Sequence, residues 1–457
     1  MSTQQQIQPP TASPAKVGKG SGLDAVPPEG NPSAGLKRGL GPVLLCGLMV
    51  GPILGSGIFI LPPLVQQAAG GWSVPAWGVT LCLNAVFAFV FGFLAVRFPG
   101  NSGVADAVAH VFGNRARLLS SLYLIAAVVF GPSAVLLTIT RYLPVPLLDA
   151  WTHGRMLAAL CLVPVGYVLL LQQIRSIGTL AFVLSSISAT LLCLGAVLVL
   201  GQYGEPGRLV PVPGSFDAQV FGHVLLMLFW CIVGWEVVGN YSDDVDRPEW
   251  TIPRAVTLSV LAVTLVELAV ALAMQMGVLP QRAGYGVARL LYPLFGTAGP
   301  AVCAMLVTAL CVTSYLMFVG GVARLVAALA LPWAKEDRGN AFLFRAARGM
   351  SARNAHGVPV MAVTLLCAAQ VAVLVCCLLG LADMEHLVAV ASGFFLTNAL
   401  FGVAAAVRLL PAMWQKGCAI LLGCALLVVL AQSAWFVLLA AAVLAILCLL
   451  PWHAVLR

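Results

Sequence analysis

Residues 50–63 read VGPILGSGIFILPP, a stretch in which glycine, serine and proline interrupt an otherwise apolar run. Gly55, Ser56 and Gly57 disfavour a continuous helix, because each glycine in a helix costs about 1 kcal/mol relative to alanine. In lipid every backbone amide must be paired, so a helix broken at membrane depth is tolerated only where it lines a cavity or is buried in protein. The stretch therefore predicts a broken spanning helix whose free amides, at the positive end of a second half-helix, suit a carboxylate.

The composition of the whole chain predicts a membrane protein. Of its 457 residues, 61% are apolar and 9% are charged, whereas a soluble domain has roughly 45–50% apolar and about 25% charged residues. This composition excludes a cytosolic enzyme, a secreted domain and a nucleic-acid-binding protein. The 13 cysteines lie almost all in apolar stretches without CxxC pairs. They indicate small apolar side chains, with no disulfide framework and no metal site.

Twelve apolar stretches are candidates for membrane spans, each of which takes about 20 helical residues. Their approximate limits are 40–64, 74–97, 117–142, 155–173, 178–201, 217–240, 253–277, 298–325, 357–380, 384–407, 417–432 and 433–451. Two shorter stretches, 103–113 and 286–296, predict amphipathic helices that lie against the bundle. Residues 1–36 are rich in Gln, Pro, Ser and Gly and predict a disordered cytoplasmic tail.

The basic residues predict the orientation in the membrane. With the N-terminus inside, 19 of the 24 Lys and Arg residues fall in cytoplasmic segments and the other 5 fall outside. Both ends are therefore expected in the cytoplasm, in a multi-pass protein of the cell (inner) membrane. The net charge of +8 then reports orientation, with no nucleic acid implied as a partner. The basic stretch from Trp333 to His356 is expected to meet anionic headgroups of membrane lipid.

A second interrupted helix is expected within LLMLFWCIVGWEVVGNYSDD, residues 225–244. Gly234 and Gly239 bracket Trp235 and Glu236, and an ionisable residue beside a glycine makes a continuous lipid-facing helix improbable. We expect this break to be less sharp than the first. The two breaks lie five spans apart, the spacing expected for inverted repeats with a substrate site between them. The alternative is that the glycines only let helices pack closely.

Three stretches resemble the amino acid-polyamine-organocation superfamily of transporters, in particular its bacterial exporters of neutral amino acids of the methionine and branched-chain type. They are GSGIFILPP at 55–63, FPGNSGVADAVAHVFG at 98–113, and FWCIVGWE at 229–236 followed by DRPEWTIPRA at 246–255. The resemblance implies an all-α membrane protein of about 12 transmembrane helices, with helices 1 and 6 interrupted. It implies a LeuT-type five-plus-five inverted repeat, formed by residues 37–201 and 202–410, with two C-terminal helices and a short cytoplasmic end in 411–457.

The resemblance also implies a substrate site. In the superfamily the unwound part of span 1 holds the substrate carboxylate, and this role falls here on Ser56 and Gly57, with Gly55 shaping the turn. Carbonyl groups of spans 1 and 6 hold the ammonium group, a role that falls on Ile53, Trp230 and Val233, next to Gly234. No cofactor or metal is implied. The chain departs from the superfamily at Pro52, where relatives often have a small or polar residue, and at Asp106 and His110 after span 2.

Two acids lie at clear membrane depth, Glu236 in span 6 and Glu267 in span 7. A charged carboxyl is costly there and functional by default, so both are candidates for proton coupling. The alternatives are a Glu236 that hydrogen-bonds the broken backbone and a Glu267 that hydrogen-bonds a neighbouring helix. Trp235 and Asn398 are candidates for a gate or pocket wall, with plain packing as the alternative.

The whole pattern predicts a secondary active transporter that moves a neutral amino acid or a similar zwitterion by alternating access, as an exporter coupled to protons. Import or exchange on the same fold, a membrane enzyme and a channel are the alternatives. The chain has no GxxxxGKS, HExxH or GxSxG motif, which disfavours an ATP-driven pump and an enzyme. Thr313 and Ser314 of span 8 could instead offer hydroxyl groups to sodium. The residues do not indicate an oligomeric state.

Overall fold

The computed structural model describes residues 39–449, except for residues 144–146, 152, 213, 281–282, 284, 336–340, 432 and 434. The tail expected at 1–36 and the C-terminal end from 450 lie outside the described residues. Within these ranges all regular elements are helical. Nine of the described helical stretches are long and apolar enough to cross a membrane, and two further apolar helices are shorter. The prediction of an all-α membrane protein is confirmed, while the count of twelve spans stays a prediction.

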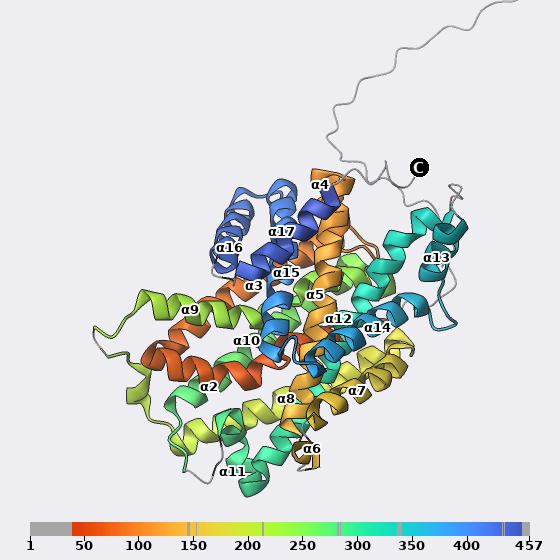
Figure 1. Cartoon of the computed structure of the whole chain (residues 1–457). Coiled ribbons are helices and arrows are strands. Elements are labelled where there is room, and N and C mark those ends of the chain that lie inside the picture. The colour runs from red at the N-terminus through yellow and green to blue at the C-terminus, as the bar shows by residue number, and fades with distance from the viewer. Residues whose placement is uncertain are drawn as a thin grey trace, which may run out of the picture. The chain divides into compact units, whose positions relative to one another are not determined.

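Each unbroken predicted span has a helix at its place in the chain (Figure 1). The helices are α3 (Ser73–Arg97), α5 (Asn114–Tyr142), α7 (Gly154–Leu170), α8 (Ile174–Tyr203), α10 (Pro248–Met276), α12 (Gly299–Lys335), α14 (Val360–Leu378), α15 (Met384–Leu409), α16 (Met413–Ala431) and α17 (Trp435–Leu449). Helix α12 continues past the predicted end at residue 325, because the sequence stays rich in alanine and leucine up to Pro332.

Both interrupted helices are present. Helix α1 (Pro42–Leu54) ends before Gly55, whose φ is +41°, and α2 (Gly57–Ala69) begins two residues later. Span 6 consists of α9 (Ala218–Leu228), the 3₁₀ segment η3 (Phe229–Cys231), a turn through Gly234 and the 3₁₀ segment η4 (Trp235–Asp244). The expectation of a less sharp second break is therefore wrong. Gly234 has φ +134°, a conformation that stops a helix, and the chain does not return to α-helix before α10.

Shorter elements connect the spans. They are η1 (Gly70–Trp72), α4 (Val104–Phe112), α6 (Leu147–Ala150), η2 (Pro206–Leu209), η6 (Gly286–Leu291), α11 (Tyr292–Phe295), η7 (Gly296–Ala298) and α13 (Ala341–Ser351). Helix α4 confirms the helix expected at 103–113. The helix expected at 286–296 is mostly 3₁₀, because positive-φ glycines at 286 and 296 and Pro293 interrupt it. Helix α13 lies in the basic stretch, where we expected no helix.

Helix α4 is fixed to α5 by an ion pair. Arg117 of α5 lies 2.9 Å from the Asp106 carboxylate and donates a hydrogen bond of 2.9 Å to Ser102. Burial raises the pKa of Asp106 above its usual range, and the charge of Arg117 opposes that shift. Asp106, a residue at which this chain departs from the superfamily, thus holds the loop after span 2 against span 3.

A buried polar chain links three spans. Tyr315 of α12 donates a hydrogen bond of 2.8 Å to Gln370 Oε1 of α14, and Gln370 Nε2 donates one of 3.1 Å to the Val128 carbonyl of α5.

Gln370→Leu removes the acceptor of a buried hydroxyl, which costs about 1–3 kcal/mol. We expect a lower thermal midpoint for the purified Gln370→Leu variant and also for Tyr315→Phe. The double variant should lose less than the sum of the two, because both polar partners are then absent; additive losses would contradict the link.

Candidate functional site

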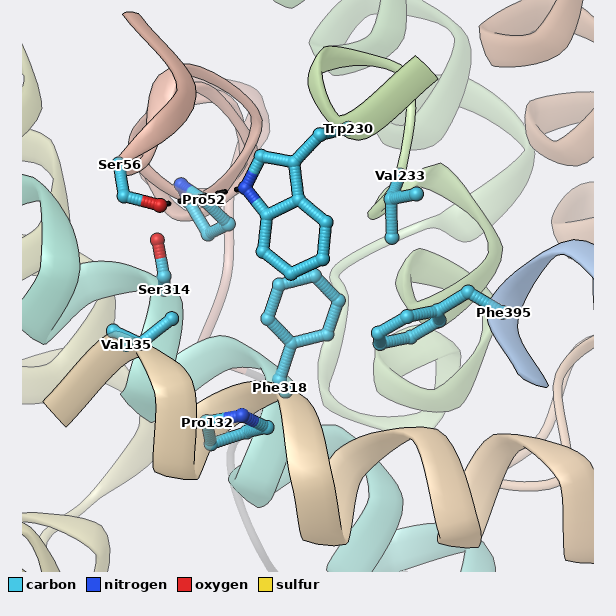
Figure 2. A pocket seen from close by; sticks show the side chains of 10 residues that line it. Pro52, Ser56, Pro132, Val135, Trp230, Val233, Ser314, Phe318 and Phe395 are labelled. Carbon is cyan, nitrogen blue, oxygen red and sulfur yellow. Dashed lines mark hydrogen bonds between the residues drawn. The ribbon is translucent and has the colours of Figure 1, made fainter. Parts of the chain in front are cut away.

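The two helix breaks line one pocket (Figure 2). Helix α1 and the first break contribute Pro52 and Ser56, and the second break contributes Trp230 and Val233. The indole N–H of Trp230 donates a hydrogen bond of 3.3 Å to Ser56 Oγ, which ties one break to the other. The remaining walls come from three spans, and they are Gly131, Pro132 and Val135 of α5, Ser314 and Phe318 of α12, and Phe395 of α15.

The pocket is contracted in this structure. Its free volume is about 20 Å³, close to the ~10–15 Å³ that one water molecule needs. The rings of Trp230 and Phe318 face each other across it (Figure 2), and the ring centres of Phe318 and Phe395 are 5.2 Å apart. A molecule larger than water can therefore enter only after one of these aromatic side chains moves.

Unpaired backbone groups lie at the two breaks. Among the described residues, the buried amide of Ser56 donates no hydrogen bond and the carbonyl of Val233 accepts none. The first amides of α2 also lack partners within their own helix, as at any helix start. The positive end of α2 at this point suits an anionic group. The negative end of α1 and the unpaired carbonyl of Val233 at the second break suit a cationic group.

The glycines of the two breaks allow close approach of the chain. A Cβ atom at Gly57 would lie 3.0 Å from Cys231 Sγ and 3.3 Å from Trp230 Cδ1, so any other residue there would have to displace these side chains by a few tenths of an ångström. A Cβ atom at Gly234 would lie 3.5 Å from the Ile53 side chain. The structure thus brings Ile53, Gly55, Ser56, Gly57, Trp230, Val233 and Gly234 into one region, of which Ser56, Trp230 and Val233 line the pocket itself.

The two candidate gate residues lie elsewhere. The buried indole of Trp235 donates a hydrogen bond of 2.7 Å to Asn84 Oδ1 on α3, which supplies the acceptor that a buried tryptophan requires. Asn398 Oδ1 accepts a hydrogen bond of 2.7 Å from Ser120 on α5. Neither residue lines the pocket, so both are placed as links between helices.

The two buried acids differ in their surroundings. Glu236 Oε2 accepts a hydrogen bond of 3.0 Å from the Gly234 amide, the arrangement of a glutamate that bridges a broken backbone. Glu267 is fully buried in α10, and among the described residues neither of its oxygens has a hydrogen-bond partner. Neither acid lines the pocket. In α12, both Thr313 and Ser314 donate to the Leu310 carbonyl of their own helix.

The walls from α5 and α15 were not anticipated from the sequence. Gly131-Pro132 in the middle of α5 carried a usable signal, since an internal proline removes a helical hydrogen bond and frees a carbonyl. Phe318 and Phe395 carried none, because a phenylalanine in an apolar span looks the same whether it faces a pocket, lipid or a neighbouring helix.

A polar cluster lies at the C-terminal end of η4 and connects it to neighbouring segments. Arg324 of α12 forms an ion pair with Asp244 and lies 4.8 Å above the Tyr241 ring. The Asp244 carbonyl accepts hydrogen bonds of 3.2 Å from the amides of Gly39 and Leu40, just before α1. Asp244 thereby connects the end of span 6 to the start of span 1 and to α12.

A family profile and individual relatives both indicate that the chain is similar to amino acid transport proteins. The sequence profile of the family described as amino acid permease matches residues 40–454. The chain is 27% identical to the L-methionine/branched-chain amino acid exporter YjeH of Escherichia coli (strain K12), over 51% of this chain and 55% of that protein. It is 29% identical to the large neutral amino acids transporter small subunit 2 of Homo sapiens, over 54% of this chain and 49% of that protein. The chain spans about half the length of the relatives it matches.

The conformation of Gly234 gives a test of the second break. A side chain at φ +134° is strained, and such strain costs of the order of 1–3 kcal/mol. We expect Gly234→Ala to lower the thermal midpoint of the purified protein. The matched control is Gly222→Ala in α9, where a Cβ atom meets nothing within 4 Å and alanine is the better helix former. An equal response of the two variants would argue against the turn at Gly234.

Proposed function

Because the chain belongs to the amino acid permease family, we propose that it transports a neutral amino acid, or a similar zwitterion, across the membrane. The observation that carries the proposal is the pocket between two broken helices, where an unpaired amide at Ser56 and an unpaired carbonyl at Val233 offer opposite partial charges. A zwitterion has both charges within a few bonds. The names of the Escherichia coli and human relatives, which refer to neutral amino acids, support the same substrate class.

The proposed binding mode uses backbone groups. The substrate carboxylate binds at Ser56 and Gly57, where the positive end of α2 attracts an anion. Its ammonium group binds the carbonyls of the two breaks, contributed by Ile53, Trp230 and Val233. No charged side chain lines the pocket, and a charge buried without a partner is costly. The substrate side chain is therefore uncharged, and the aromatic and aliphatic walls favour an apolar one.

We propose alternating access between two inverted repeats, residues 37–201 and 202–410, with residues 411–457 outside the repeats. The contracted pocket and the Arg324–Asp244 ion pair fit a closed form of such a cycle. Opening requires Trp230 or Phe318 to move away from the pocket. A form open at the end near η4 further requires the ion pair to separate.

The proposal also covers the direction of transport, the coupling ion and the membrane in which the protein lies. Export is the direction favoured by the likeness to the Escherichia coli exporter, with import or exchange on the same fold as the alternative, and we propose proton coupling from the two acids at membrane depth. The distribution of Lys and Arg supports a cell (inner) membrane protein with both termini in the cytoplasm. Glu236 and Glu267 are the candidate proton carriers.

Counterflow in proteoliposomes tests the proposed activity. Each of the twenty amino acids is supplied in turn as the trapped substrate, and we expect saturable exchange for neutral ones only. Gly57→Leu should abolish exchange, since its side chain would fill the space before Cys231 and Trp230. Gly78→Leu on α3, where a Cβ atom meets nothing within 4 Å, should exchange as the unaltered protein does. Exchange retained by Gly57→Leu, or non-saturable flux, would refute the proposed site.

The aromatic wall gives a prediction about specificity. Phe318 occupies the pocket between Ser314 and Phe395 (Figure 2), so Phe318→Ala enlarges the space for the substrate side chain. We expect competition assays to rank large amino acids such as tryptophan higher in Phe318→Ala than in the unaltered protein, with weaker binding of small ones. An unchanged ranking would place the substrate side chain elsewhere.

A further inference from the structure

Glu267 is a fully buried acid that has neither a charged partner nor a hydrogen bond among the described residues. It lies within α10, whose main neighbours are α1, α2, α3 and α8, with η2 and η6 near its ends. Among the described residues neither carboxyl oxygen has a hydrogen-bond partner. A carboxylate in such surroundings is costly, so the closed arrangement favours the neutral acid.

The charged groups of the neighbouring elements lie away from Glu267. They are all arginines near the ends of their segments, namely Arg97 of α3, Arg175 of α8, Arg208 of η2 and Arg289 of η6. The cysteines of these elements are Cys46, Cys82 and Cys193. The thiol of Cys231, at the end of η3, is the titratable side chain that interacts electrostatically with the Glu267 carboxyl.

Cys231 connects this acid to the first helix break. Its sulfur lies 3.0 Å from the position that a Cβ atom of Gly57 would occupy, and it is packed in a buried cluster with Trp77 of α3 and Ala271, one turn after Glu267 on α10. The indole nitrogen of Trp77 is a further buried polar atom without a hydrogen-bond partner among the described residues. The cluster therefore places the Cys231 thiol against the start of α2, and it holds one further buried polar atom without a partner among the described residues.

Glu236 is equally buried, and its Oε1 also has no hydrogen-bond partner among the described residues, but its second oxygen differs. Its Oε2 already accepts the Gly234 amide, so it has a structural task in holding the second break. Of the two acids at membrane depth, Glu267 is the one whose surroundings leave it free to gain and lose a proton as the conformation changes.

We propose that Glu267 is the proton-binding residue of the transport cycle, and that Cys231 transmits its charge state to the substrate carboxylate site at Gly57. The inference rests on the proposed transport function and specifies its coupling. When the protein opens, the Glu267 carboxylate takes a proton from hydronium on one aqueous side, and after the conformational change it returns that proton to water on the other. An ionised Glu267 changes the electrostatic potential at the start of α2, which links proton occupancy to substrate binding.

The test compares exchange with gradient-driven flux in proteoliposomes. We expect Glu267→Gln to retain exchange of a neutral amino acid with no pH dependence, and to lose the net flux driven by a pH gradient. Glu249→Gln, at an exposed acid in the first turn of the same helix, is the matched control and should retain gradient-driven flux. Glu236→Gln tests the other buried acid, and because glutamine keeps an acceptor oxygen for the Gly234 amide it should also retain that flux. Gradient-driven flux in Glu267→Gln, or its loss only in Glu236→Gln, overturns the proposal. Absence of amino acid exchange in the unaltered protein would instead refute the transport function itself.

A second variant covers the case in which Glu267→Gln does not fold. Glu267→Asp keeps the carboxyl group, but its side chain is one methylene shorter, so the carboxyl lies farther from Cys231. If this carboxyl sets the pH dependence, the midpoint of exchange against pH must move in Glu267→Asp. A midpoint identical to that of the unaltered protein would overturn the assignment.

Discussion

The requirement that every buried backbone amide and carbonyl be paired governs this structure. Within an apolar bundle the simplest solution is an unbroken α-helix, and most of the spans follow it. The two exceptions, at Gly55-Ser56 and around Gly234, leave amides and carbonyls that helix geometry does not satisfy. Both exceptions face one pocket enclosed by α5, α12 and α15, so the cost of breaking the helices is confined to a single place.

The surrounding polar side chains stabilise these breaks. Trp230 bonds Ser56 across the pocket, Glu236 accepts the Gly234 amide, and Trp235 is fixed to Asn84 on α3. Each of these hydrogen bonds fixes a segment of irregular backbone, either to the other break, to itself or to helix α3. Among the described residues the Ser56 amide and the Val233 carbonyl stay unpaired, and these are the groups that the proposed zwitterionic substrate would satisfy. Structure and recognition thus depend on the same few atoms.

The contracted pocket bears on the dynamics of the molecule. About 20 Å³ of free volume cannot hold an amino acid, so the proposed binding of one requires side chains that line the pocket to move. The ion pair between Arg324 and Asp244, together with the hydrogen bonds to Gly39 and Leu40, closes the polar end of η4. These contacts join the start of span 1, the end of span 6 and α12, so the proposed opening at this end requires them to separate.

The sequence by itself determined the all-α membrane fold, the places of the helices and the two breaks, because hydropathy and the glycine and proline positions act locally along the chain. It could not determine which residues from distant spans complete the pocket, since Phe318 and Phe395 have the same local signature as any lipid-facing phenylalanine. It also ranked the two breaks wrongly and could not separate Glu236 from Glu267, because both acids lie in apolar sequence. The fold alone reveals that the Glu236 carboxyl accepts a backbone amide while the Glu267 carboxyl has no hydrogen-bond partner among the described residues, because hydrogen bonding depends on which groups the fold brings within about 3 Å of each other.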